Sequence, residues 1–142
     1  MMLDQVITAS IVLFHNKKED LQKVIESFLG HKGNVNLILV DNSSNDELSS
    51  LANDPRINYI FNNSNLGFGK AHNIALNQAF NLNSDYHIFL NPDIYFSPVI
   101  ISIILQRFEN EESIGLISPK ILYKNNEVQF LCKLLPTPID LI

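Results

Sequence analysis

Short apolar runs rich in β-branched residues alternate with segments of helical periodicity along most of this sequence. Runs with the length and composition of strands lie at 7–14, 36–40, 57–61, 86–90 and 114–118. Apolar residues at helical spacing cover 18–29, 46–52, 67–80 and 98–108. Alternation of this kind is typical of sheets whose neighbouring strands run parallel. It predicts an α/β fold, with a mostly parallel sheet and helices on both faces.

Local signals set the expected boundaries of these elements. Polar residues that commonly cap helices precede three of the predicted helices: Asn16, Ser44 or Asn45, and Ser97, the last followed by Pro98. We expect Gly30 or Gly33 to end the first helix. A stripe of small residues for close packing on a sheet runs along the third predicted helix: Ala71, Ala75 and Ala79. The pair Asn125–Asn126 predicts a hairpin turn.

Length and composition narrow the function classes. The chain has 142 residues, and we expect one domain over 1–142. Fifteen acidic and ten basic residues give a net charge of −5, which argues against nucleic-acid or anionic-membrane partners. Cys132 is the only cysteine, so an internal disulfide and a cysteine-based zinc site are excluded. No signal peptide or transmembrane stretch is visible, which predicts a soluble, cytoplasmic protein.

Polar clusters follow each of the first four predicted strands. They are His15–Asn16, Asp41–Asn42–Ser43–Ser44, Asn62–Asn63–Ser64–Asn65 and Asn91–Pro92–Asp93. Ligands of open parallel sheets bind outside the carboxyl ends of the strands. Because parallel strands end at the same edge, these clusters are expected to share one rim of the sheet.

The residue types in these clusters favour a nucleotide diphosphate. Asp41 can accept hydrogen bonds from a ribose or a pyrimidine N–H, or it forms an Asx turn with nearby backbone. Asp93 suits Mg²⁺ held jointly with substrate phosphates, or it is a turn residue. The segment from Asn65 to Lys70 provides free backbone N–H groups at a helix start, where an anion binds, or it is simply a tight entry into the helix. The Gly-x-x-x-x-Gly-Lys-Ser/Thr spacing of a Walker motif is absent from this segment.

The four histidines differ in their expected roles. His15 follows a strand at its carboxyl end, where it can touch a ligand. His72 and His87 fall on a helix and in a strand, and we interpret both as structural. His31 is expected at the surface near the end of the first helix.

Four segments in order resemble one enzyme family. SIVLFHN, LILVDNSSND, NNSNLGFGKAHNIAL and HIFLNPDI look like the N-terminal half of a family 2 glycosyltransferase with the GT-A fold, closest to the rhamnosyltransferase-like group. The resemblance covers about residues 7 to 98. It implies a nucleotide-diphosphate-sugar donor, inverting transfer to a hydroxyl of a saccharide or lipid-linked saccharide, and a role in bacterial surface polysaccharide synthesis, in the cytoplasm or peripherally at the inner face of the membrane.

The resemblance also assigns donor-binding roles residue by residue. His15 and Asn16 fall in the first nucleotide-contacting loop, and Asp41, followed by Asn42, matches the acid that binds the base or ribose. The segment near the ribose and diphosphate contributes Asn65, Gly67, Lys70 and Asn73. Asn91 and Asp93 occupy the Asp-x-Asp position, where Asp93 would ligate Mg²⁺ or Mn²⁺.

Three departures from the family pattern shape the expected activity. Asn91 replaces the first acid of Asp-x-Asp, and His15 stands where an aromatic residue is frequent. The family's catalytic Asp or Glu lies in the acceptor-binding half, and no downstream acid here stands in a matching motif. We therefore leave the catalytic residue unassigned and expect weak nucleotide binding with little turnover.

The apolar segment 131–142 predicts a shortened domain without its acceptor half. A domain shortened in this way leaves apolar surface uncovered, and such a surface favours self-association into a homo-oligomer.

Two other hypotheses fit parts of the sequence. One is a non-catalytic module that binds a nucleotide sugar, in which the short form is the natural product. The other is a receiver-like phosphoacceptor domain, favoured by the length, the alternation and Lys120 after the fifth predicted strand. Against the receiver, the first strand ends in His15–Asn16 rather than an acidic pair, and the third has no aspartate at its end.

Overall fold

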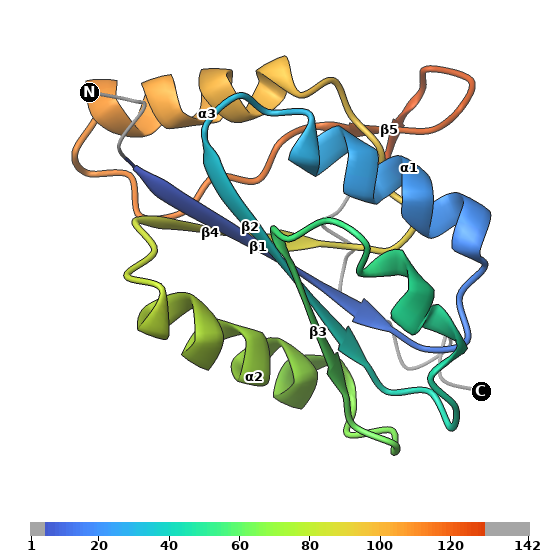
Figure 1. Cartoon of the computed structure of the whole chain (residues 1–142). Helices are drawn as coiled ribbons and strands as arrows, with labels where there is room; N and C mark the ends of the chain where they lie inside the picture. Colours follow the sequence, from blue (N-terminus) through green and yellow to red (C-terminus); the bar gives the residue numbers. More distant parts are fainter. Residues whose placement is uncertain (1–4, 130–142) are drawn as a thin grey trace, which may run out of the picture.

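The computed structural model describes residues 5–129 and is organised around a four-stranded sheet (Figure 1). The strands are β1 (Val6–Leu13), β2 (Asn34–Asp41), β3 (Ile57–Phe61) and β4 (Tyr86–Leu90). Their order is β3-β2-β1-β4, and all three pairings are parallel. The expected parallel α/β sheet is therefore confirmed.

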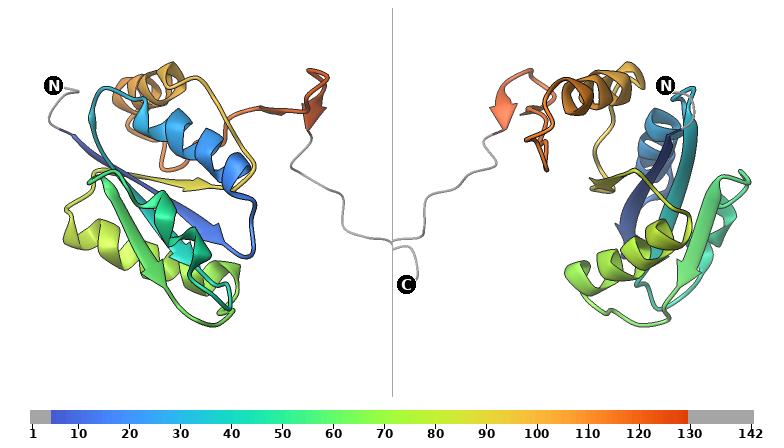
Figure 2. Two further views of the ribbon diagram at one scale, coloured as in Figure 1. Left: turned by 45° about the vertical axis from the view of Figure 1, so that its right-hand side comes forward. Right: turned by 90° about the vertical axis from the view of Figure 1, so that its left-hand side faces the viewer.

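Helices cover both faces of this sheet. They are α1 (Lys18–Leu29), the 3₁₀ helix η1 (Glu47–Leu51), α2 (Phe68–Asn81) and α3 (Val99–Asn110). Figure 1 shows α1 and α3 on one face and α2 on the other. A small hairpin of β5 (Ile121–Leu122) and β6 (Val128–Gln129) follows, turning at Asn126 as expected, and lies apart from the main sheet (Figure 2).

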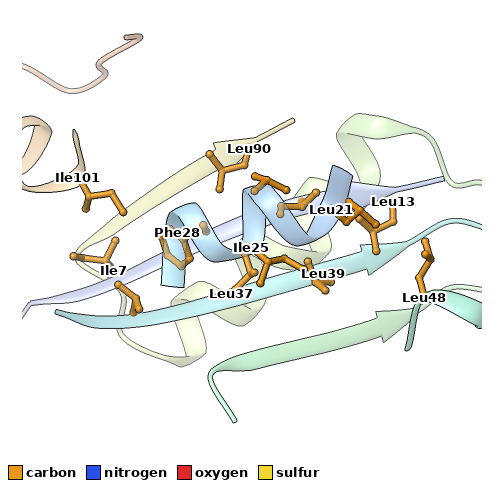
Figure 3. Close-up of a cluster of buried hydrophobic side chains, with 14 of the residues drawn as sticks. Ile7, Leu13, Leu21, Ile25, Phe28, Leu37, Leu39, Leu48, Leu90 and Ile101 are labelled. Carbon is orange, nitrogen blue, oxygen red and sulfur yellow. The ribbon is translucent and has the colours of Figure 1, made fainter. Parts of the chain in front are cut away.

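The face under α1 and α3 holds the larger core. One set of alternate β1 residues, from Ile7 to Leu13, packs there with Phe28 of α1 and Ile101 of α3 (Figure 3). Burying an aliphatic or aromatic side chain of this size contributes roughly 1.5–3 kcal/mol. Gly30 ends α1 as predicted, and it lies so close to α3 that an added Cβ would meet Pro98 Cγ at 2.7 Å.

The face under α2 holds a smaller core with smaller side chains. The expected alanine stripe is present: Ala71, Ala75 and Ala79 are buried against β1 and β2. Their partners are Val12, Ile38 and Val40. The small side chains let α2 lie close to the sheet. The first turn of α2 lies beside the ends of the strands.

Several expected details differ in the structure. Ile114–Ser118 is not a strand: among residues 5–129 no strand pairs with it, and Leu116 is 82% exposed. A strand needs a hydrogen-bonded neighbour, which composition alone does not supply. The helix expected over 46–52 is the shorter η1. In the described part of the chain, no helix is long and apolar enough to cross a bilayer. The segment 131–142 lies outside the described residues.

The expected caps are also wrong. Lys17, Asp46 and Pro98 occupy the N-cap positions of α1, η1 and α3, and none of these three helices has a side-chain cap hydrogen bond. Asn16 instead accepts a hydrogen bond from Phe14 N–H at 2.7 Å. The residue type alone therefore does not decide which residue occupies the N-cap position. The conformation of the preceding loop also matters.

Candidate functional site

All four polar clusters follow the carboxyl ends of parallel strands, so they occupy one rim of the sheet (Figure 1). Two loops on this rim are joined by hydrogen bonds. Asn42 N–H donates to the Leu13 carbonyl at 2.9 Å, and His15 N–H donates to Ser43 Oγ at 2.9 Å. His15 itself is exposed and has a φ of 51°. Its side chain is therefore presented to solvent at the end of β1.

Asp41 ends β2 and is fully buried. Its Oδ1 accepts a hydrogen bond from Ser43 N–H at 2.8 Å, and its Oδ2 accepts one from the Tyr59 hydroxyl at 2.5 Å. The first contact is the Asx turn that the sequence allowed. Burial, together with the hydrogen bond to Asp41, raises the pKa of Tyr59 well above its ordinary value, so the phenol keeps its proton. In this conformation the buried carboxylate of Asp41 holds Ser43 and Tyr59 in place through these two hydrogen bonds.

Asn42 connects three segments of the rim. Its Oδ1 accepts a hydrogen bond from Asn62 Nδ2 at 2.8 Å. Its Nδ2 lies 3.5 Å from Asn65 Oδ1 and 3.4 Å from the Gly67 carbonyl. Asn65 Oδ1 also accepts from Gly67 N–H at 2.9 Å. The amide of Asn42 thus ties β2 to the start of α2, and its side chain is itself buried.

The start of α2 presents polar groups to solvent. Gly67 has a φ of 81°, a conformation that side chains other than glycine rarely adopt. No side chain caps the first N–H groups of the helix. Lys70 and Asn73 are exposed on its first turns. Unpaired N–H groups and the positive helix end make this a suitable surface for an anion.

Asn91 and Asp93 stand on the turn that follows β4, and both are exposed. The backbone of this turn is held by Ile94 N–H, which lies 3.4 Å from the Asn91 carbonyl. Among the described residues, no group of three or more His, Cys, Asp or Glu side chains is placed to hold a metal ion. Carboxylate and amide oxygens fit Mg²⁺ or Mn²⁺ only when other ligands, such as phosphates and water, complete the shell.

Sequence reasoning missed a polar network on the α2 face of the sheet. We name it the histidine network: Thr8, Ser10, His72, Ser84 and His87. His87 Nδ1 lies 2.7 Å from Thr8 Oγ1 and its Nε2 lies 2.8 Å from Ser10 Oγ. Ser10 Oγ also lies 2.8 Å from His72 Nδ1. The available signal was the pair of hydroxyl residues at alternate positions of an otherwise apolar strand.

Both histidines of the network are held neutral. Burial lowers the pKa of His72, and burial together with the nearby His72 lowers the pKa of His87 to about 4. Both histidines contact hydroxyl groups of β1. A neutral imidazole carries one donor and one acceptor nitrogen, and its tautomer decides which nitrogen donates.

A cavity of about 390 Å³ lies away from the rim, beside the start of β3. Two of its charged residues are paired with each other: Arg56 donates to both carboxylate oxygens of Asp54, and it also donates to the Leu29 carbonyl. The hydrogen bond from Arg56 lowers the pKa of Asp54 to about 2. Because these groups bond one another, we take the polar rim, and not this cavity, as the candidate site.

Comparison with known proteins agrees with this fold. TarS 1-349 of S. aureus superposes with a TM-score of 0.63 and 16% identity, over 83% of this chain and 39% of TarS 1-349. The longer TarS structure gives 0.63 and 15%, over 83% of this chain and 24% of that one. TarS 1-349 in complex with UDP-GlcNAc gives 0.63 and 16%, over 83% and 38%. This chain therefore spans less than half of these structures.

The fold is thus that of a GT-A-like α/β domain. Residues 10–131 match the family model described as Glycosyl transferase family 2. The chain belongs to this family. No protein among the curated ones matches the sequence.

Proposed function

We propose that this chain forms the donor-binding part of a single GT-A glycosyltransferase domain, with residues 1–142 inside that part. The enzyme moves a sugar from a nucleotide-diphosphate donor to a hydroxyl acceptor. The observation that carries this proposal is the gathering of four polar loops on one rim in a chain of this family. Binding of UDP-GlcNAc by TarS, a structural neighbour, adds support for a nucleotide-sugar donor.

Each part of the rim has a role in this proposal. His15, Asn16, Asp41 and Asn42 surround the nucleoside. Because Asp41 is fully buried and both its oxygens accept hydrogen bonds, a direct contact to the base requires local rearrangement around Tyr59. A second route is indirect, in which Asp41 positions Asn42 and Ser43 for the ligand.

The diphosphate side is formed by the start of α2 and the turn after β4. Asn65, Gly67, Lys70 and Asn73 offer N–H groups, an ammonium and amides. Asn91 and Asp93 would hold Mg²⁺ or Mn²⁺ between chain and diphosphate. Such a cation supplies Lewis-acid stabilisation of the leaving group, worth several kcal/mol.

The proposed reaction is a single inverting displacement. The acceptor hydroxyl loses its proton to a base, its oxygen bonds to the anomeric carbon, and the bond from that carbon to the diphosphate oxygen breaks. The base is not assigned. Glu109 lies beside Gln5, which precedes β1, and so sits at the sheet edge opposite the rim. Asp140 lies outside the described residues.

The acceptor is proposed to be a saccharide or lipid-linked saccharide of a bacterial surface polysaccharide, with rhamnosyltransferase-like chemistry. Transfer would take place in the cytoplasm or peripherally at the inner face of the membrane, and the chain would self-associate. A non-catalytic nucleotide-sugar module is the second candidate, because no base is assigned among residues 5–129. The receiver-like hypothesis is not supported, since the chain belongs to a glycosyltransferase family.

Calorimetry tests the site assignment. We expect one of UDP, GDP or dTDP to bind weakly, more tightly with Mn²⁺, and Asp93→Asn to remove the metal-dependent part. Glu26→Gln makes the same charge change on the exposed side of α1 and serves as the control. Binding that needs neither Mn²⁺ nor Asp93 would overturn the assignment. Hydrolysis or transfer assayed with UDP-GlcNAc separates an enzyme from a binding module.

A further inference from the structure

The hydrogen-bond distances of the histidine network fix its direction. Ser84 Oγ lies 2.8 Å from the Tyr86 carbonyl, and a carbonyl only accepts, so the Ser84 hydroxyl proton points there. Ser84 Oγ must then accept from Thr8 Oγ1, 2.8 Å away. The Thr8 hydroxyl has no second proton, so His87 Nδ1–H donates to it at 2.7 Å.

The same reasoning continues to the end of the network. His87 is neutral and its Nε2 carries no proton, so it accepts from the Ser10 hydroxyl. Ser10 Oγ in turn accepts from His72 Nδ1–H at 2.8 Å. His72 therefore has a bare lone pair on Nε2. The opposite direction would leave two oxygens 2.8 Å apart with no proton between them.

His72 Nε2 is buried and has no hydrogen-bond partner. The whole residue is only 4% exposed. Buried polar atoms without a partner are rare in native proteins, and each calls for an explanation. His72 is on the second turn of α2, and helical side chains lean toward the helix N-terminus, which is at the rim.

Two aromatic rings pack against the His72 imidazole. Phe68 and Phe89 meet His72 edge-on, with ring centroids at 4.3 and 5.1 Å. These two phenylalanines are 58% and 51% exposed. Phe68 directly follows Gly67, and Phe89 stands two residues before Asn91. Both rings are therefore at the surface between His72 and the residues of the rim that are nearest to them in sequence.

The lone pair selects the kind of group that binds there. A phosphate oxygen is also an acceptor and would be repelled, so the partner must be a hydroxyl or an N–H. The start of α2 is the part of the rim proposed to face ribose and diphosphate. Of these two, only the ribose has donors.

We propose that His72 is a ligand-contacting residue of the donor site, whose Nε2 accepts a hydrogen bond from a ribose hydroxyl of the nucleotide. This inference rests on the proposed function. Ser10, His87 and Thr8 are positioning residues, because they hold His72 in the tautomer that leaves Nε2 as the acceptor.

The first test needs no ligand. Long-range ¹H–¹⁵N spectra of the histidine side chains distinguish a protonated from a bare ring nitrogen. We expect Nδ1–H on both His72 and His87, with His72 Nε2 bare. A proton on His72 Nε2 in the free protein would overturn the proposal regardless of what binds.

The second test uses two substitutions that keep different halves of the imidazole. In His72→Asn the amide nitrogen replaces Nδ1, so the Ser10 contact is kept and the acceptor is lost. In His72→Gln the amide lies near the position of Nε2, so an acceptor is kept and the Ser10 contact is lost. We expect His72→Asn to weaken UDP binding about three- to tenfold while thermal stability stays near that of the parent. His72→Gln should keep more of the affinity and lose stability.

Deoxy analogues identify the group on the ligand. With 2′-deoxy-UDP or 3′-deoxy-UDP, one of the two should bind the parent and His72→Asn with equal affinity, because the contact is already missing. Equal weakening of UDP and both analogues by His72→Asn would overturn the ribose assignment.

Failure of the two proposals is distinguishable. If the parent binds none of UDP, GDP or dTDP, the proposed function fails and this inference with it. If the parent binds and His72→Asn binds equally well, only this inference fails. An unchanged His72 Nε2 signal at saturating UDP has the same meaning.

Discussion

The two faces of the sheet are built on different principles, although β1 contributes to both. Toward α1 and α3, the alternate residues Ile7, Ala9, Ile11 and Leu13 are all apolar and buried in a continuous aliphatic core. Toward α2, the intervening residues begin with the hydroxyls of Thr8 and Ser10. The first face can supply most of the stability, which leaves the second free to carry polar groups beside the candidate site.

This difference has a physical reason. Large aliphatic side chains gain free energy in proportion to the area they bury, and they need no defined partners. A buried polar group is tolerated only when it is hydrogen-bonded in a fixed geometry. The α2 face accordingly combines small alanines with a directed network, in which one acceptor is left for a ligand.

The largest effect should come from the aliphatic face. Phe28→Ala removes a fully buried ring and should lower the free energy of unfolding by about 3–5 kcal/mol. Phe80→Ala, on α2, removes a ring that is 74% exposed and should change it by less than about 0.5 kcal/mol. Urea unfolding measures both. Similar losses would mean that Phe80 is covered in solution, and that the contrast between the faces is smaller than proposed.

The next effect is a pH dependence confined to the α2 face. His87 has a pKa of about 4 when folded and near 6.5 when unfolded, so the unfolded chain binds the proton first as the pH falls. The free energy of unfolding contributed by His87 is fully present above about pH 6.5 and should decline as the pH falls toward 4. His72 shifts in the same direction.

His87→Asn should flatten this decline, because the replacement does not titrate. His31→Asn is the control: it removes a histidine from the surface beside α1 and should leave the decline in place. Chemical unfolding at several pH values gives the comparison. An unchanged slope in His87→Asn would show that other groups cause the acid sensitivity.

A smaller effect tests the close approach of α2. Ala75→Leu adds three carbons at a fully buried position under the helix and should cost about 1–3 kcal/mol through overpacking. Asn77→Leu, exposed on the same helix, should be close to neutral. If Ala75→Leu is also neutral, this face holds unfilled space. Thermal unfolding followed by circular dichroism is sufficient.

The smallest effect concerns the start of α3. Ser97→Ala should change the free energy of unfolding by less than about 0.5 kcal/mol, since no side chain caps this helix. A true N-cap serine would cost about 1 kcal/mol. A loss of that size in urea unfolding would restore Ser97 as the cap. The helix is held instead by Ile101 and Leu105, which bury its inner face.

Much of the fold was predictable because its signals are local. The strands 57–61 and 86–90 and the helix 18–29 have the predicted bounds, since each is an apolar run with clear breaks at both ends. The polar rim followed from topology: once the strands are parallel, the residues after them share an edge. The site roles of His15, Asp41 and Asp93 remain predictions until ligand binding is measured.

The missed features depend on partners distant in the sequence. Ile114–Ser118 has strand composition, yet among the described residues no strand lies beside it to complete the pairing. The histidine network joins Ser10 to His72 and Thr8 to His87, 62 and 79 residues apart. Periodicity places each of these residues on a face, but it does not say which hydroxyl meets which ring.

The sequence by itself determined the α/β alternation, the parallel sheet, the family and the rim on which polar residues gather, because these follow from apolar period and from short motifs. Only the tertiary structure decided that Asp41 is buried beneath the rim, that the Asn42 side chain ties the end of β2 to the loop between β3 and α2, and that His72 presents an unpaired acceptor. These depend on which side chains the packed sheet brings within hydrogen-bond distance, and hydrogen bonds are sensitive to distance and angle in a way that composition does not record.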